Sequence, residues 1–257
     1  MITSATNNRM KRLVQLREKS KVRFEENVFL TEGIKMFEEA PNEWVREIYV
    51  SESFCHKENN QILLKNRNFE MVSDEVFKKI SDTVTPQGIL CVLDRPSYNL
   101  EELLQKKNGL FLILEDIQDP GNLGTIVRTA EGAGVDGIFM SRETVDLFNP
   151  KTIRSSMGSI FRVPFFYEDS LKERIEYLKK KQITIYAAHL EGAVFYDTQD
   201  YQKGTAFLIG NEGQGLKKET ADLADTAIKI PMCGKVESLN AAIAAALLTY
   251  EANRQRR

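Results

Sequence analysis

The chain has 257 residues, enough for one large or two medium domains, and its share of aliphatic and aromatic residues is that of an ordinary globular protein. No apolar run reaches the roughly 18 residues of a membrane span, and residues 1–10 are polar and lack an apolar signal core, so we expect a cytoplasmic protein without a membrane partner. Three widely separated cysteines and only two histidines disfavour a disulfide framework, a metal site and a histidine-based triad.

The distribution of charge is uneven. The net charge of −2 argues against a nucleic-acid binder. Between Met1 and Arg23, however, seven lysines and arginines accompany a single acid, Glu18. A basic segment on an acidic body favours a polyanionic partner. A solvated helix face with no partner explains the segment equally well, so charge alone leaves both interpretations open.

Short helices and strands alternate over residues 1–94. Apolar residues at helical spacing predict a helix over residues 5–20. Further along we expect strands at 27–30, 44–50, 69–72 and 88–93, and helices at 32–40, 58–65 and 74–80. This order is typical of a small α/β/α domain. Residues 95–108 contain turn-forming and charged residues and are expected to form a linker, with room for one helical turn.

Residues 109–257 form the second predicted domain. Residues 110–114 are apolar on both faces, as expected of a buried parallel strand. The further strands are expected at 137–140, 160–166, 183–188, 206–209 and 227–230, and the helices at 124–133, 150–157, 171–180 and 238–253. Strands that alternate with helices predict an α/β fold with a parallel sheet covered on both faces. Ligands of such sheets bind at the carboxyl ends of the strands.

Three loops follow buried strands and carry polar residues to that edge. In the first loop, Pro120 and Gly121 suit a tight turn, and Asn122 is in position to cap the next helix. Arg128 lies in the first half of that helix. It is interpreted either as a surface arginine that pairs with Glu131 or as a group that holds a phosphate or an oxyanion.

The second and third loops are equally open to interpretation. Residues 210–215 have the glycine spacing G-x-x-G-x-G, the reverse of the dinucleotide-binding fingerprint, so they favour close backbone approach over a phosphate cradle. Glu212 is either a solvent-exposed acid or a group that accepts a proton or orients a substrate hydroxyl. In the third loop, Ser238 or Asn240 caps the last helix.

Together these loops resemble the three signature motifs of the SpoU/TrmH family of SPOUT methyltransferases, which methylate the 2′-hydroxyl of RNA ribose. The first motif, N-x-G-x-x-x-R-T-A, corresponds to residues 122–130, the second to residues 210–216, and the third to residues 230–232 with 236–240. The resemblance covers the chain from about residue 109 onward. More weakly, residues 29–33 and 87–89 are similar to the family's substrate-binding domain. Ala241 and Ala242 stand where Val-Ser is often seen, a change in helix packing alone.

The resemblance implies a deep trefoil knot in the C-terminal domain, an obligate homodimer, and S-adenosylmethionine bound by main-chain groups of the knot loops. The catalytic positions that it implies are Arg128, Asn122, Glu212, Ser238 and Asn240. The cofactor-binding positions that it implies are Gly210, Ile230, Leu239, Met232 and Leu190, with no metal required.

For the substrate, the resemblance favours ribosomal RNA over tRNA, because family members with the extra N-terminal domain often act on ribosomal RNA. Three alternatives stay open at this point: a tRNA 2′-O-methyltransferase, a non-catalytic RNA-binding protein that retains the fold, and a methyltransferase for a small molecule or a base.

Overall fold

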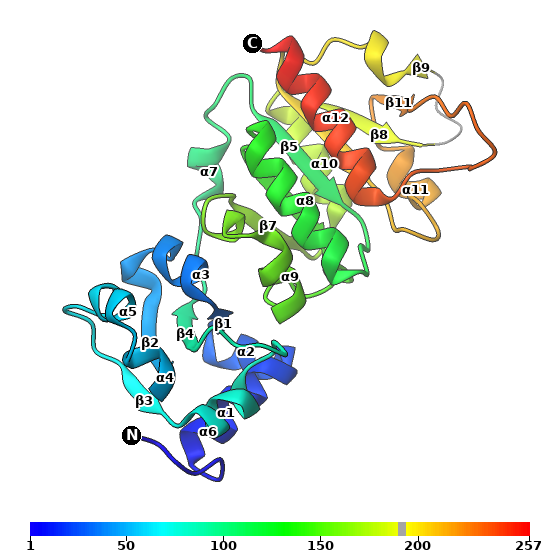
Figure 1. The fold of residues 1–257 in the computed structure, drawn as a ribbon. Helices are drawn as coiled ribbons and strands as arrows, with labels where there is room; N and C mark the ends of the chain where they lie inside the picture. The colour runs from blue at the N-terminus through cyan, green and yellow to red at the C-terminus, as the bar shows by residue number, and fades with distance from the viewer. Residues whose placement is uncertain (190–193) are drawn as a thin grey trace. The chain divides into compact units, whose positions relative to one another are not determined.

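The computed structural model describes residues 1–189 and 194–257, which form two compact units, each with its own sheet (Figure 1). Unit 1 comprises Met1–Ser97 and Asp146–Phe161. Unit 2 comprises Tyr98–Val145 and Arg162–Arg257. Residues 146–161 lie within the predicted C-terminal domain, yet they pack with the N-terminal elements. The sequence alone gives no sign that residues 146–161 belong to unit 1.

Unit 1 is built on a four-stranded sheet of order β1-β4-β2-β3, in which β4 runs antiparallel to β1 and β2, and β3 runs parallel to β2. Its strands are β1 (Val28–Glu32), β2 (Val45–Ser51), β3 (Glu70–Val72) and β4 (Ile89–Asp94). Its helices are α1 (Asn8–Glu18), α2 (Ser20–Glu26), α3 (Ile34–Glu39), α4 (Glu52–Cys55), α5 (Glu58–Leu63), α6 (Asp74–Ile80) and α9 (Pro150–Ser156). Apolar residues of α1 and α6 bury one face of the sheet. The single predicted helix over residues 5–20 is wrong in its end, because Lys19 is extended and a second helix follows it.

The arginines of the basic N-terminal segment bind within unit 1. Their partners are Glu70 for Arg9, Glu26 and Glu47 for Arg12, the carbonyl oxygens of Lys79 and Ser81 for Arg17, and Asp146 for Arg23. The segment therefore offers less unpaired positive charge than its sequence predicts. Its lysines, Lys11, Lys19 and Lys21, are exposed.

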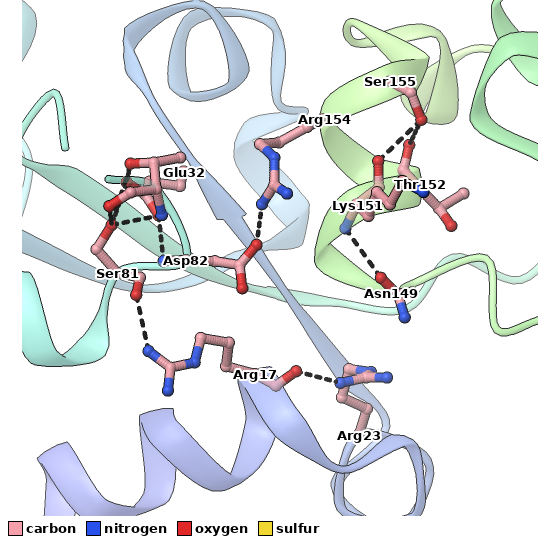
Figure 2. A network of polar contacts seen from close by, with 11 residues as sticks. Arg17, Arg23, Glu32, Ser81, Asp82, Asn149, Lys151, Thr152, Arg154 and Ser155 are labelled. Carbon is pink, nitrogen blue, oxygen red and sulfur yellow. Dashed lines mark hydrogen bonds and ion pairs between the residues drawn. The ribbon is translucent and has the colours of Figure 1, made fainter. Parts of the chain in front are cut away.

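A polar network ties the end of β1 to the loop after α6 (Figure 2). The Glu32 carboxylate accepts hydrogen bonds from the hydroxyl of Ser81 (2.7 Å), the backbone N–H of Asp82 (3.0 Å) and the hydroxyl of Thr83 (2.6 Å). Arg154 of α9 pairs with the Asp82 carboxylate. These contacts hold α9 and this loop in one unit although they are far apart in the sequence.

Unit 2 is a seven-stranded parallel sheet of order β7-β6-β5-β10-β8-β11-β9. Its strands are β5 (Leu110–Leu114), β6 (Gly137–Ser141), β7 (Phe165–Glu168), β8 (Thr184–Ala188), β9 (Val194–Phe195), β10 (Thr205–Ile209) and β11 (Thr226–Lys229). Its helices are α7 (Leu100–Leu103), α8 (Pro120–Ala133), α10 (Leu171–Lys180), α11 (Lys218–Ala221) and α12 (Ala241–Gln255). The prediction of an α/β fold with a parallel sheet is confirmed.

Helices α8 and α12 lie side by side over one face of this sheet, and α10 packs on the other (Figure 1). The two helices are parallel: their first residues meet through Asn240 and Asn122, and near their ends Asn253 donates to the carbonyl oxygen of Ala133 (3.0 Å). Both helices therefore begin at the carboxyl edge of the strands.

Two predicted elements of the second half are corrected. Residues 160–166 are not one strand, because Ser159–Phe161 form a 3-10 helix whose Ile160 is fully buried, and β7 begins only at Phe165. Helix α8 begins four residues before the predicted start. The short elements α4, α11 and β9 were not predicted. In the part of the chain that the structure describes, every helix is too short or too polar to span a bilayer.

The buried pair of Arg23 and Asp146 gives a test of unit 1. The Arg23 side chain is 4% exposed, donates to both Asp146 Oδ2 (2.6 Å) and the carbonyl oxygen of Leu16 (2.6 Å), and leaves these acceptors unpaired if it is removed. We expect Arg23→Met to lower the free energy of unfolding by about 3 kcal/mol. Trp44, the only tryptophan, contacts Phe161, so its fluorescence in urea reports on unit 1.

The matched control is Lys21→Met. This lysine is 83% exposed and forms only a long pair with Glu25, so its loss should cost less than about 1 kcal/mol. Equal urea midpoints for the two variants would contradict the structural importance of Arg23.

Candidate active site

The first loop of the site ends in a capped helix. Asp119 is the N-cap of α8, and its carboxylate accepts the backbone N–H of Asn122 (2.8 Å). Pro120 stands at the first helical position, where the missing N–H costs nothing. The prediction that Asn122 caps this helix is therefore wrong. The Asn122 side chain is instead available for contacts with the other loops.

The Glu212 carboxylate lies at the N-terminus of α8. It accepts the backbone N–H groups of Gln118 and Asp119 (both 3.1 Å) and the side-chain amide Nδ2 of Asn122 (2.9 Å). A carboxylate at this end of a helix is stabilised by unpaired N–H groups and by the helix dipole. Glu212 thus joins the second loop to the first.

The third loop is connected through Asn240. Its Oδ1 accepts the backbone N–H groups of Ala242 (2.9 Å) and Ile243 (3.3 Å), which makes Asn240 the N-cap of α12. Its Nδ2 is then left to donate to Oδ1 of Asn122 (2.9 Å). Because Asn122 in turn donates to Glu212, every amide in this chain of contacts has a defined orientation.

The pKa of Glu212 bears on its role. Burial by itself raises this pKa, but the hydrogen bonds from Asn122, Gln118 and Asp119 outweigh it and lower the pKa below its usual value. A carboxylate with three donors and a low pKa is ionised at neutral pH and is a poor proton acceptor. The geometry favours a role in holding the loops over a role as a general base.

Arg128 and Ser238 lie outside this chain of hydrogen bonds. Arg128 is exposed on α8, and Glu131 pairs with Arg162 (2.6 Å); among the described residues no ion pair joins Arg128 to Glu131. Among the residues described, neither Arg128 nor Ser238 makes a hydrogen bond or ion pair with another side chain. The guanidinium of Arg128 is therefore accessible to an anion from outside the protein.

The positions predicted to bind a cofactor follow neighbouring strands. Strands β10, β8 and β11 are adjacent and parallel, so Gly210 and Ile230, which directly follow β10 and β11, lie at the same edge of the sheet. A Cβ on Gly210 would lie 2.3 Å from the carbonyl carbon of Gly215, so the turn requires glycine. Leu190, which follows β8, lies outside the described residues.

Leu239 and Met232 belong to a segment of irregular backbone between β11 and α12. Both are half-buried, and no intramolecular backbone hydrogen bond is found for either of them in the described ranges. Free main-chain groups beside a tight glycine turn fit a ligand that is held by backbone hydrogen bonds. Within residues 1–189 and 194–257, no group of three or more histidine, cysteine or acidic side chains is arranged to hold a metal ion.

Two contributors to the site were not predicted from the sequence. Asp119 caps α8, and its backbone N–H, like that of Gln118, fixes the Glu212 carboxylate. The Asp-Pro pair is a recognisable helix start, which offers a signal for Asp119. The backbone donor of Gln118 has no such signal, because any residue supplies the same N–H.

Two family models match the chain. Residues 109–250 match the SpoU rRNA methylase family, and residues 7–91 match an MRM3-like substrate-binding domain. A curated relative, the 23S rRNA (guanosine(2553)-2′-O)-methyltransferase RlmP of Bacillus subtilis, is 35% identical over 97% of each chain. The match to RlmP thus covers nearly all of this chain and of the relative.

Solved structures agree with the family models. An rRNA methyltransferase from Sinorhizobium meliloti, solved with bound AdoMet, is 32% identical and covers 98% of this chain and 97% of its own, with a TM-score of 0.85. The TrmH/SpoU tRNA-modifying enzyme of A. aeolicus is 30% identical and covers 61% of this chain and 80% of its own, with a TM-score of 0.54. The chain belongs to the SpoU rRNA methylase family and is an S-adenosylmethionine-dependent RNA 2′-O-methyltransferase.

Proposed function

We propose that this protein methylates a ribose 2′-hydroxyl of ribosomal RNA in the cytoplasm. The observation that carries the proposal is the extent of the matches: the 23S rRNA enzyme RlmP matches 97% of the chain, including unit 1. The tRNA-modifying enzyme matches only 61%. The N-terminal domain thus accompanies relatives named for ribosomal RNA, which makes a tRNA substrate the second candidate.

Mapping of ribose methylation in total RNA, from cells with and without the gene, tests this proposal. We expect one 2′-O-methyl group of ribosomal RNA to disappear when the gene is deleted and to return with a plasmid copy. Loss of a methyl group from tRNA alone would contradict the proposal in favour of the second candidate.

In the proposed mechanism, S-adenosylmethionine supplies the methyl group as an electrophilic sulfonium. The methyl group would pass from sulfur to the ribose oxygen with cleavage of the sulfur–methyl bond, and the hydroxyl proton would pass to solvent, so negative charge develops on the oxygen as the new bond forms. Arg128 is exposed and without an acidic partner among the described residues, so its guanidinium can bind the neighbouring RNA phosphate and stabilise this charge. Because a guanidinium gives up its proton very reluctantly, we assign Arg128 this electrostatic role and not the role of the base.

The remaining catalytic candidates position the loops. Glu212 and Asn122 hold the second loop against the start of α8, and Asn240 holds the start of α12 against Asn122. Ser238 is exposed in the third loop, where its hydroxyl is available to the substrate. For the cofactor we propose main-chain contacts at Gly210, Ile230 and Leu239 with Met232 beside them, and a knotted chain path as the family implies.

Substitution of Arg128 tests its role. Removal of one preorganised donor typically lowers the rate on the order of 100-fold or more, which we expect for Arg128→Ala in single-turnover transfer of a labelled methyl group. Arg128→Lys keeps the charge but loses the two-pronged donor and should give an intermediate rate.

The control is Lys180→Ala, which removes an exposed cation of α10 on the opposite face of the sheet. We expect the methyl-transfer rate of this control to equal that of the unmodified protein. All three variants should bind S-adenosylmethionine with the affinity of the unmodified protein, measured by calorimetry. Full turnover by Arg128→Lys would refute a bidentate contact with phosphate.

We also propose that the protein is a homodimer through α12. Ile243, Leu247 and Tyr250 lie on one face of this helix and are 51%, 38% and 46% exposed. The opposite face is buried against the sheet and α8. An exposed apolar stripe on an otherwise packed helix is typical of a subunit interface. Arg128 lies on the neighbouring helix, so a partner subunit seated here would border the active site.

A charge in this stripe should separate the subunits. We expect Leu247→Glu to sediment as a monomer and to lose most methyl transfer, because a buried unpaired carboxylate is costly in an interface. Lys172→Glu, which changes an exposed residue of α10, should leave the sedimentation coefficient unchanged. A monomeric unmodified protein would exclude the dimer proposal.

A further inference from the structure

Glu115 is a buried carboxylate that no part of the proposed mechanism uses. It directly follows β5 and is 3% exposed. Its Oε2 accepts the backbone N–H of Lys217 (2.8 Å), and its Oε1 accepts the hydroxyl of Thr220 (2.5 Å). Burial of a carboxylate is costly unless it is hydrogen-bonded. Here both bonds come from the segment that leaves the Glu212 loop.

Asp116, the next residue, contacts both ends of the same loop. Its carboxylate pairs with Nζ of Lys217 (2.8 Å) and accepts the hydroxyl of Ser141 (2.8 Å). Its backbone carbonyl accepts Nδ2 of Asn211 (2.8 Å), at the start of the loop. Asp116 adopts the left-handed conformation (φ 55°), which is unusual for a residue other than glycine and turns the chain toward these partners.

Electrostatics support the pair at neutral pH. Burial by itself raises the pKa of the Asp116 carboxyl, but the hydrogen bonds from Lys217 and Ser141 lower it below its usual value. The Asp116 carboxylate in turn raises the pKa of Lys217. Both groups are therefore charged at neutral pH.

The loop between these anchors is closed by its own hydrogen bonds. Asn211 and Gly215 exchange two backbone hydrogen bonds (3.0 and 2.9 Å), which closes a five-residue turn around Glu212. Oδ1 of Asn211 accepts the N–H groups of Gly213 (2.8 Å) and Gln214 (3.0 Å) inside the turn. Because these hydrogen bonds restrain the turn, the position of Glu212 depends on the contacts that hold the two ends of the turn.

We propose that Glu115, Asp116 and Lys217 form a brace that positions the Glu212 loop for catalysis. The brace is defined by these three residues, which act through Glu212 and Asn122 on Asn240 and touch neither substrate nor cofactor. They are positioning residues of the methyl transfer reaction. The inference rests on the proposed function for its kinetic test and on the geometry alone for its exchange test.

Amide hydrogen exchange in the protein without cofactor or RNA tests the geometry. The backbone N–H groups of Gln118 and Asp119 donate to Glu212, so their exchange reports on whether the loop is in place. We expect Glu115→Gln and Lys217→Met to speed exchange at these two amides about 10-fold, and to leave the amides of β5 unchanged. Lys218→Met is the matched control, because this lysine is 88% exposed and pairs only with Asp222.

The kinetic test separates positioning from general stability. We expect Glu115→Gln to lower kcat about 10-fold, because a small misplacement of a positioned group is costly, and to leave the KM for RNA unchanged. In a protein that already carries Glu212→Gln, the same substitution should lower kcat little further, since the brace acts through Glu212.

Two results would overturn the proposal. One is unchanged exchange at Gln118 and Asp119 in Glu115→Gln. The other is a loss in kcat that multiplies with that of Glu212→Gln, which indicates independent effects. The exchange experiment needs no substrate, so a protein that passes it but methylates no ribosomal RNA supports the brace and refutes the proposed substrate.

Discussion

One carboxylate holds the active-site edge of unit 2 together. Glu212 occupies the N-terminus of α8, where unpaired N–H groups and the helix dipole favour a negative charge. From there, oriented amides of Asn122 and Asn240 carry the connection to the start of α12. Without an anion at this point, two backbone donors and one side-chain amide would lack acceptors, and three loops that are distant in the sequence would have no common anchor.

Two residues of the first motif differ in their surroundings: Asn122 helps to hold the loops together, whereas Arg128 takes no part in these contacts. Glu212, Asn122 and Asn240 use their side-chain polar groups for contacts with one another. They therefore hold the three loops in fixed positions relative to each other. Arg128 stands on the same helix as Asn122 but faces solvent without an acidic partner among the described residues. In the mechanism that we propose, this cation binds RNA next to loops that are already held in place, so the donor need not reorganise as negative charge develops on the ribose oxygen.

Much of unit 2 was predictable because its signals are local. Residues 110–114 are apolar on both faces and form a strand buried on both faces, and three loops after such strands were expected to meet at one edge. Asn122, Glu212 and Asn240 do meet there. What the sequence did not show depends on distant contacts: Ile160 follows a strand-like pattern but is buried in a 3-10 helix, and Arg12 and Arg17 contact residues of unit 1 that no periodicity connects to them. The knot that the family implies is likewise invisible to periodicity.

The composition of unit 1 has a consequence for synthesis on the ribosome. Arg23 is a buried residue near the start of the chain, whereas its carboxylate partner Asp146 lies 123 residues later. Strands β5 and β6 of unit 2 are translated between the two. A nascent chain that has emerged only as far as Ser97 still lacks α9 and the carboxylate that pairs with Arg23. Unit 1 therefore cannot complete its fold before the first strands of unit 2 have been translated. The last elements of unit 1 are therefore synthesised after the first strands of unit 2.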